Sequence, residues 1–226
     1  MIEIFLLSLI QGITEFLPIS SSSHLIIFSN YTEFTNRSLS IDISLHIGSF
    51  IAVITYFYKD IADFVKNRDL FLKIIISSIP VMIIGFFLVQ SNLIEQLRNI
   101  NTNLNYKSAI YIGLFQVFSL MPGVSRSGIS ITAARFLKFK RFDAAKISFL
   151  LSIPTLGAVS MFGLKNVIFS QEVSISILNL ISILLSFIFS FVTIKYFLKY
   201  IKNFNLNIFV YYRITLGVIL LSIAYL

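Results

Sequence analysis

The sequence lacks cysteine altogether and is poor in charged residues. With no cysteine among 226 residues, disulfide bonds and thiolate metal sites are excluded, and the redox compartment cannot be inferred. Charged residues make up only 12% of the chain, whereas hydrophobic residues make up 57%. A soluble domain of this length could not bury so much apolar surface. We therefore expect an integral membrane protein, folded as a single membrane domain over residues 1–226.

The start of the chain also lacks the basic residues and the small-residue cleavage site of a secretory signal. It reads Met-Ile-Glu-Ile-Phe, so we expect no removable signal peptide. The net charge of +8 comes from lysines and arginines that lie between apolar runs. Cytoplasmic loops of membrane proteins carry such an excess, so we interpret the charge as membrane anchoring and expect no nucleic-acid partner.

Several apolar segments are long enough to cross a bilayer as helices. They comprise residues 42–58, 70–89, 143–164, 174–197 and 207–226. Pro80 predicts a kink in the second of them. Residues 91–105 carry Glu95, Arg98 and five asparagines, which favours a loop or a surface helix there.

Two further apolar segments are interrupted by short polar turns. Residues 2–17 are short for a span, end at Pro18 and four serines, and are followed by an apolar piece at 24–28. Residues 106–121 and 128–137 flank a second turn. Broken backbone is tolerated at membrane depth only where protein or water covers it. We therefore predict an all-α, polytopic helical bundle with two re-entrant helix hairpins.

The two hairpins resemble each other. A glutamine precedes each turn, at Gln11 and Gln116, and an aspartate opens the next long apolar segment, at Asp42 and Asp143. This similarity favours an internal repeat, with a first half at about 1–105 and a second at about 106–226. Paired interrupted helices predict a binding site between the halves. The alternative is chance similarity in a chain rich in serine and isoleucine.

Basic residues predict the orientation of the bundle. They gather at residues 59–73, 135–146 and 195–202. With all three groups in the cytoplasm, the first hairpin opens outward and the second inward, as in an inverted repeat. That topology needs one more crossing between residues 89 and 106, which look too polar, so the number of spans stays open.

The second turn, residues 122–128, reads Pro-Gly-Val-Ser-Arg-Ser-Gly. An arginine inside an apolar region is costly unless it faces an anion, so Arg126 predicts a functional site. Its planar guanidinium matches a phosphate, and Ser125 and Ser127 add hydroxyl groups beside it. Freed backbone N–H groups at such a turn also bind anions.

The first turn carries a carboxylate and a histidine. Gln11 and Glu15 are four residues apart, so they share a helix face and can converge on one ion or phosphate. Glu15 is a suitable ligand for Mg²⁺ or Ca²⁺. The simpler alternatives are that Glu15 caps the following turn and that Gln11 bonds a neighbouring helix.

A serine hydroxyl of the first turn can reach His24 if the segment is helical. Ser20 and Ser21 precede it by four and three residues, so a serine activated by the histidine is a plausible nucleophile, with direct attack by the histidine as the rival. The plainer alternative is that Ser22 or Ser23 caps a helix. His46 is interpreted as structural.

These residues resemble the bacterial undecaprenyl-diphosphate phosphatases, the bacitracin-resistance family. The family's Glu/Gln-x-x-x-Glu stretch running into Leu-Pro-x-Ser-Ser-x-x-His is matched by residues 11–24, and its Pro-Gly-x-Ser-Arg-Ser-Gly by residues 122–128. Further similarity lies at residues 46–48, 148–154 and 212–213. The resemblance covers nearly the whole chain.

The resemblance implies removal of the terminal phosphate from undecaprenyl diphosphate with a divalent cation, Mg²⁺ or Ca²⁺. This reaction recycles the lipid carrier for peptidoglycan synthesis in the bacterial plasma membrane. Ser21 would be the nucleophile, His24 the base, Arg126 the phosphate clamp and Glu15 a metal or phosphate ligand. The expected substrate-binding residues are Gln11, Ser20, Ser22, Gly123, Ser125, Arg126 and Ser127. The expected partners are the lipid substrate and membrane lipids, and a homodimer is left open.

Three departures from the family pattern stand out. Gln11 stands at a position where the family has Glu or Gln, so this chain lacks the charge that a glutamate would supply. Ser23 replaces the usual glycine, and a serine adopts a positive φ less readily than glycine does. The polar residues 91–105 stand where relatives have another span, so the first half looks shortened. The alternatives are a polyprenyl-phosphate transporter or flippase, since broken helices in inverted repeats also serve transport, and a non-catalytic lipid-binding relative.

Overall fold

A computed structural model describes residues 1–32, 38–66, 106–120, 124–137, 139–169, 176–204 and 206–225. Every element in the described part is a helix. The order is α1 (Ile2–Thr14), α2 (Ser21–Thr32), α3 (Leu39–Tyr56), α4 (Tyr58–Lys66), α6 (Tyr106–Gln116), the 3₁₀ helix η1 (Val117–Leu120), α7 (Arg126–Phe136), α8 (Arg141–Phe169), α9 (Ile177–Asn203) and α10 (Asn207–Tyr225). The span expected at 70–89 and the loop expected at 91–105 lie outside the described residues.

Three of the described helices are long and apolar enough to cross a membrane. They are α3, the Arg141–Lys165 part of α8, and α9. Each of them overlaps one of the spans predicted at 42–58, 143–164 and 174–197. The segment predicted at 207–226 is helical as α10 over Asn207–Tyr225.

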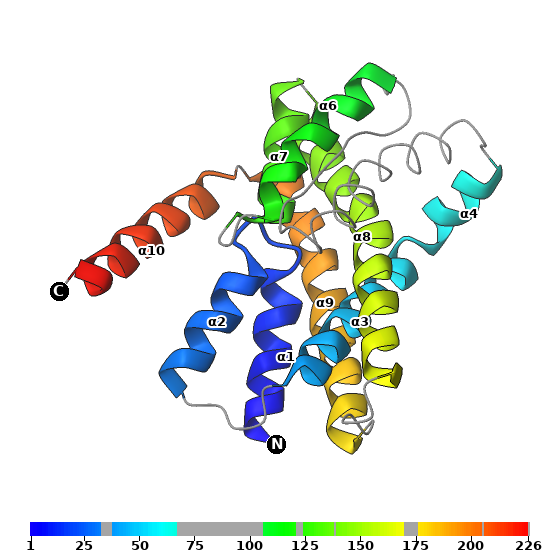
Figure 1. The fold of residues 1–226 in the computed structure, drawn as a ribbon. Helices are drawn as coiled ribbons and strands as arrows, with labels where there is room; N and C mark the ends of the chain where they lie inside the picture. The colour runs from blue at the N-terminus through cyan, green and yellow to red at the C-terminus, as the bar shows by residue number, and fades with distance from the viewer. Residues whose placement is uncertain are drawn as a thin grey trace.

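Helix α9 is the centre of the bundle, with α1 and α3 packed along it (Figure 1). Small residues make this contact close: a Cβ on Gly12 of α1 or on Gly48 of α3 would overlap the backbone of α9. The α3–α9 contact also contains Ser49, whose hydroxyl lies 2.9 Å from that of Ser190. Small residues and interhelical hydrogen bonds are the usual means of holding helices together in a membrane.

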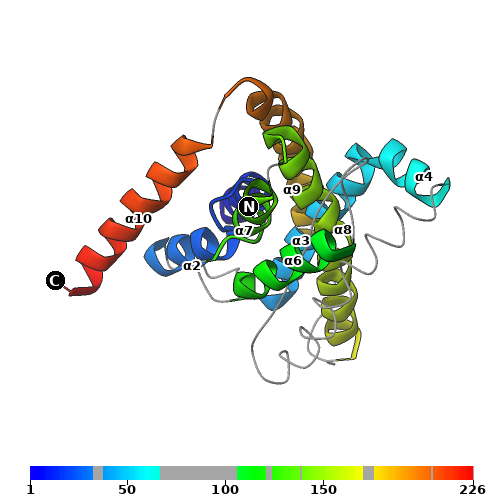
Figure 2. The same cartoon turned by 90° about the horizontal axis from the view of Figure 1, so that it is seen from above.

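Two antiparallel helix pairs approach the middle of the bundle from opposite ends. These are the pair α1 and α2 and the pair α6 and α7, and the residues between α1 and α2 face the start of α7 (Figure 1). Seen along the bundle, α7 overlies α1 (Figure 2). Where the turns meet, the Ser127 hydroxyl donates to the Leu17 carbonyl over 2.7 Å. Helix α2 is longer than the piece expected at 24–28.

The first turn is anchored in the main apolar core. Phe16 is fully buried and packs edge-on against Phe149 of α8, with ring centroids 5.3 Å apart. Phe149 in turn contacts Phe57 and Phe197, which come from the end of α3 and from α9. The turn after α1 is therefore fixed by side chains from three other parts of the bundle, which holds its polar residues in place.

The ends of α7 and α9 and the start of α8 lie at the same end of the bundle (Figure 1). Several basic residues belong to this end. Arg135 donates to the Phe139 carbonyl, Arg141 donates to the Phe204 carbonyl, and Lys146 pairs with Asp60. The α6–α7 pair lies at this same basic end, and the α1–α2 pair opens toward the other.

Helix α10 leans away from the rest of the bundle (Figures 1 and 2). Only its first half comes close to the two turns, through Tyr212 and Arg213. Many of its apolar side chains are exposed, among them Ile208, Val210 and Ile214.

Candidate active site

The first turn places a carboxylate at the end of α1. Helix α1 closes with the Glu15 N–H donating to the Gln11 carbonyl over 2.9 Å, and the Glu15 side chain is buried. Ser20 then takes a φ of 70°, which is strained for a residue other than glycine, and α2 starts at Ser21. The positive φ therefore falls at Ser20. Ser23, where family members carry glycine, lies within α2.

The second turn places an arginine at the start of α7. Ser125 is the N-cap, and its Oγ accepts a hydrogen bond from the Gly128 N–H over 3.1 Å. The Ser127 hydroxyl donates a hydrogen bond to the Leu17 carbonyl oxygen, and it also lies 3.1 Å from the Ser125 Oγ. Both serines therefore hold the turn together, so a phosphate would have to displace these bonds to use their hydroxyls. Gly123 lies outside the described residues.

An ion pair joins the two turns. The Nη2 of Arg126 lies 2.5 Å from the Oε1 of Glu15, although the two residues are 111 positions apart in the chain. The Nη1 of Arg126 donates to the Thr155 Oγ1 of α8 over 2.5 Å. The sequence prediction that the two polar turns assemble one cluster is thus realised at this contact.

The second oxygen of Glu15 receives two hydrogen bonds. The Ser21 hydroxyl donates to Oε2 over 2.7 Å, and the Gln11 amide donates to it over 3.1 Å. Gln11 and Glu15 therefore converge as their i, i+4 spacing predicts. Ser21 is in contact with a carboxylate that can accept its proton, as a serine nucleophile requires.

His24 does not contact a serine hydroxyl, so the predicted serine–imidazole bond is wrong. Its Nδ1 lies 2.6 Å from the Ser20 carbonyl oxygen, and its Nε2 lies 2.6 Å from the Tyr212 hydroxyl. A carbonyl only accepts, so Nδ1 carries the proton and Nε2 is the acceptor for Tyr212. The two rings are stacked with centroids 5.8 Å apart.

Two other serines of the first turn contact each other, and a third is exposed. The Ser20 hydroxyl lies 3.1 Å from that of Ser23, and Ser22 is exposed on α2. Neither Ser22 nor Ser23 caps a helix, since α2 already starts at Ser21.

Four residues near the site were not among the predicted ones. His46 of α3 contacts Gln11, Thr155 of α8 holds Arg126, and Tyr212 of α10 holds His24. Arg213 lies beside the start of α7, since a Cβ on Gly128 would be 3.3 Å from its Nη1. The sequence could have pointed to these four residues. Three of them lie in stretches similar to the family, at 46–48 and 212–213, and Thr155 directly follows the stretch at 148–154.

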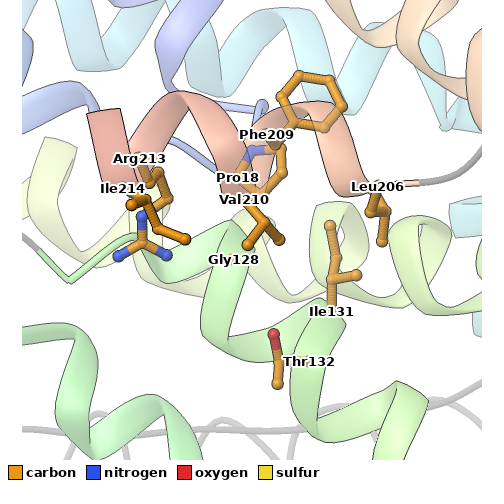
Figure 3. Close-up of a pocket in the computed structure, with 9 residues that line it drawn as sticks. All are labelled: Pro18, Gly128, Ile131, Thr132, Leu206, Phe209, Val210, Arg213 and Ile214. Carbon is orange, nitrogen blue, oxygen red and sulfur yellow. The ribbon is translucent and has the colours of Figure 1, made fainter. Parts of the chain in front are cut away.

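A groove of about 370 Å³ runs between α7 and α10, beside the two turns (Figure 3). Its lining is mostly apolar. Pro18 of the first turn and Gly128 of the second border it, and Arg213 and Leu206 lie toward opposite ends of it (Figure 3). The rest of its lining is Ile131, Thr132, Phe209, Val210 and Ile214. The groove thus presents a mostly apolar lining beside the two turns.

The oxygen ligands of the cluster fit a weakly held divalent cation. The Gln11 Oε1 is buried without a hydrogen-bond partner in the described part of the chain, while the Nε2 of the same amide faces the Glu15 carboxylate. Among the described residues, no group of three or more histidine, cysteine, aspartate or glutamate side chains could hold a metal. Mg²⁺ is commonly bound by one or two carboxylates together with substrate phosphates, and this residue set fits that mode.

Comparison with known proteins identifies the family. The family model for bacitracin resistance protein BacA matches residues 4–102 and 87–219. The undecaprenyl-diphosphatase of Pelagibacter ubique (strain HTCC1062) is 46% identical over 251 aligned positions, covering 99% of this chain and 98% of that protein. The undecaprenyl-diphosphatase of Jannaschia sp. (strain CCS1) is 35% identical and covers 98% of each chain. This chain belongs to the bacitracin resistance protein BacA family.

Proposed function

We propose that this protein is a phosphatase that removes the terminal phosphate of undecaprenyl diphosphate, as an integral, multi-pass protein of the bacterial plasma membrane. One observation carries the proposal: Glu15 pairs with Arg126 across the two turns and accepts a hydrogen bond from the Ser21 hydroxyl. We assign the serine as the nucleophile, the carboxylate as its base and the guanidinium as the phosphate-binding group. The choice of substrate is based on the relatives, which are named undecaprenyl-diphosphatase. The product, undecaprenyl phosphate, returns as carrier for cell-wall synthesis, which accounts for bacitracin resistance.

The membrane topology is part of the proposal. The pairs α1–α2 and α6–α7 are re-entrant hairpins that belong to inverted repeats, and their turns meet within the bilayer. Their opposite opening directions and the basic residues at one end of the bundle support this topology. A homodimer stays a prediction.

The substrate takes the place of an internal contact. A terminal phosphate that enters the cluster replaces Glu15 on the Nη2 of Arg126, while Thr155 keeps the other nitrogen in place. Arg213 lies at the groove, on the side from which the second phosphate would approach. The apolar groove between α7 and α10 receives the first isoprene units of the lipid (Figure 3).

The first chemical step transfers the phosphoryl group to the protein. The Ser21 Oγ attacks the terminal phosphorus and passes its proton to the Glu15 Oε2, with which it is already hydrogen-bonded. The bond from phosphorus to the bridging oxygen breaks, and undecaprenyl phosphate leaves. Arg126 stabilises the charge on the transferring group, which is the main requirement in phosphoryl transfer.

The second step releases inorganic phosphate. Water attacks the phosphorus of phosphoserine, the bond from phosphorus to the Ser21 Oγ breaks, and Ser21 recovers its proton from Glu15. His24 accepts the proton of the water at Nε2, the nitrogen that accepts from Tyr212 in the present structure. His24 is therefore proposed as the base of this step rather than of the first one.

A divalent cation, Mg²⁺ or Ca²⁺, is also part of the proposal. Glu15 would hold it together with the substrate phosphates. It would supply neutralisation of the diphosphate charge.

The phosphatase proposal is tested by trapping labelled phosphate. Purified protein in detergent is mixed with undecaprenyl diphosphate labelled in its terminal phosphate and quenched within the first turnover. We expect label on Ser21 by peptide analysis, and neither label nor phosphate release in Ser21→Ala. Full activity of Ser21→Ala would rule out this nucleophile.

A flippase would need phosphate recognition at Arg126 but no activated serine. The hydrogen bond from Ser21 to Glu15 therefore favours a phosphatase. A non-catalytic lipid-binding relative would bind undecaprenyl diphosphate without releasing phosphate, so the trapping experiment separates both alternatives from the proposal.

A further inference from the structure

A second histidine lies against the carboxylate cluster. The Nδ1 of His46, in the middle of α3, lies 3.0 Å from the Gln11 Nε2 and 4.0 Å from the Glu15 Oε2. The sequence interpretation of His46 as purely structural overlooked this contact. Because His46 touches the residue that supports Glu15, it can affect the reaction without contacting substrate.

The packing of the bundle fixes the distance between His46 and Gln11. Gly12 lets α1 pack closely on α9, and Gly48 lets α3 do the same. Each glycine is within two residues of one of the partners. Since α1 and α3 are both held against one rigid helix, the imidazole and the amide are kept in hydrogen-bonding range.

The surroundings of Gln11 dictate the orientation of its amide. Its nitrogen faces both a carboxylate oxygen of Glu15, at 3.1 Å, and the His46 Nδ1, at 3.0 Å. A carboxylate accepts but cannot donate, so the amide nitrogen must stand on this side. Its two hydrogens then serve Glu15 and His46, which requires an Nδ1 without a proton and a ring protonated on Nε2.

The opposite orientation of the amide would disable the cluster. A rotated amide would point its oxygen at the Glu15 carboxylate and would withdraw the donor that supports Oε2. His46 opposes this rotation, because an unprotonated Nδ1 also needs the amide N–H. The orientation leaves the Gln11 Oε1 buried without a partner in the described part of the chain, available to a group that arrives with the substrate.

We propose that His46 is a positioning residue for the phosphatase reaction: it accepts a hydrogen bond from Gln11, which keeps the amide N–H on Glu15 and the amide oxygen free for the substrate complex. The inference rests on the proposed function. Through Gln11, His46 holds the Glu15 Oε2 where it meets the Ser21 hydroxyl. Partners of this kind typically affect activity by about 10- to 100-fold.

The first test uses side chains that imitate one ring nitrogen each. The oxygen of Asn lies near the place of Nδ1, whereas the amide of Gln reaches the place of Nε2. We expect His46→Ala and His46→Gln to lower kcat about tenfold or more with KM changed less than about twofold, and His46→Asn to restore most of kcat. Equal activity in all three variants, or a failure of Asn to restore it in a folded protein, would overturn the proposal.

The second test asks whether His46 acts through Gln11. In a Gln11→Ala background the amide is gone, so His46→Ala should lower kcat no further. If the two residues acted independently, the fold-losses of kcat in the two single variants would multiply in the double variant, and the coupling energy of the double-mutant cycle would be zero. That result would exclude the proposed route.

A third test does not depend on activity. The chain has only two histidines, so His24→Asn leaves His46 as the one imidazole. Nitrogen-15 NMR of labelled histidine in this variant should show the tautomer protonated on Nε2, and Gln11→Leu should change the Nδ1 signal. A ring protonated on Nδ1 would contradict the proposal. If wild type released no phosphate, the proposed function would fail, while the NMR result would still decide the contact of His46.

Discussion

At the scale of single residues, Glu15 is the point on which the cluster depends. One of its oxygens meets Arg126, and the other accepts from Ser21 and Gln11. Burying a carboxylate is unfavourable unless it is paired and hydrogen-bonded. Here the Arg126 guanidinium, the Ser21 hydroxyl and the Gln11 amide compensate for the burial. The same contacts set the proposed nucleophile against its proposed base.

Thr155 is predicted to orient the phosphate-binding arginine. Its Oγ1 accepts from Arg126 and donates to backbone carbonyls of α8, which fixes one arm of the guanidinium. A hydrogen bond to a charged group contributes about 1.5–3 kcal/mol, so Thr155→Val should lower kcat/KM by about tenfold or more. Steady-state phosphate release measures this effect. Thr155→Ser, which keeps the hydroxyl, is the matched control, and an equal loss in both variants would argue against the role.

Local spacing made part of the site predictable. An arginine and a carboxylate in apolar surroundings indicate function by their cost, and Gln11 joins Glu15 through a spacing of four residues. His46 was missed because it lies 35 residues from its partner. The bond expected between serine and His24 failed because the imidazole found a backbone carbonyl and Tyr212, which is 188 residues away.

At the scale of elements, the close approach of α1 and α3 to α9 positions the site. Apolar length alone predicted α3, α8 and α9, because a span needs a fixed number of residues. It did not predict which helices would touch, since that depends on small residues such as Gly12 and Gly48 meeting the right neighbour. The extent of α2 was also missed, because its start follows from the unusual φ of Ser20.

Gly12→Ala is expected to destabilise the protein. The added Cβ would overlap the Phe189 side chain and the Ser190 backbone of α9. Overpacking of this kind costs about 1–3 kcal/mol, which exceeds the gain of up to about 1 kcal/mol from alanine's helix propensity. Thermal unfolding in detergent should show a lower midpoint. Gly217→Ala in α10 is the control, because nothing lies within 4 Å of its added Cβ; a drop of equal size there would contradict the packing explanation.

At the scale of the whole molecule, the site is built from the two halves of the chain. The two turns approach from opposite ends of the bundle and meet at Glu15 and Arg126 (Figure 1). Pairing of the turns could be predicted from their similarity, but the contact itself could not, because 111 residues separate its members. The groove beside α10 was not predictable either, since it depends on where the first half of that helix lies relative to α7.

The orientation of the bundle is predicted from its basic end. Single cysteines can report it without background, because the chain has none. Ser38 at the start of α3 and Asn203 at the end of α9 are both exposed and lie at opposite ends of the bundle. In intact cells, an impermeant maleimide should label Ser38→Cys from outside and Asn203→Cys only after permeabilisation. The reverse pattern would overturn the assigned orientation.

The central claim is that the two turns form one phosphatase site, and phosphate release tests it most directly. Release from undecaprenyl diphosphate by purified protein in detergent would be compared for wild type, Glu15→Gln, Arg126→Ala and the double variant. We predict release by wild type, a loss of about 10²-fold or more in each single variant, and little further loss in the double variant, because residues acting as a unit are non-additive. No release by folded wild type, or full activity in either single variant, would contradict the account.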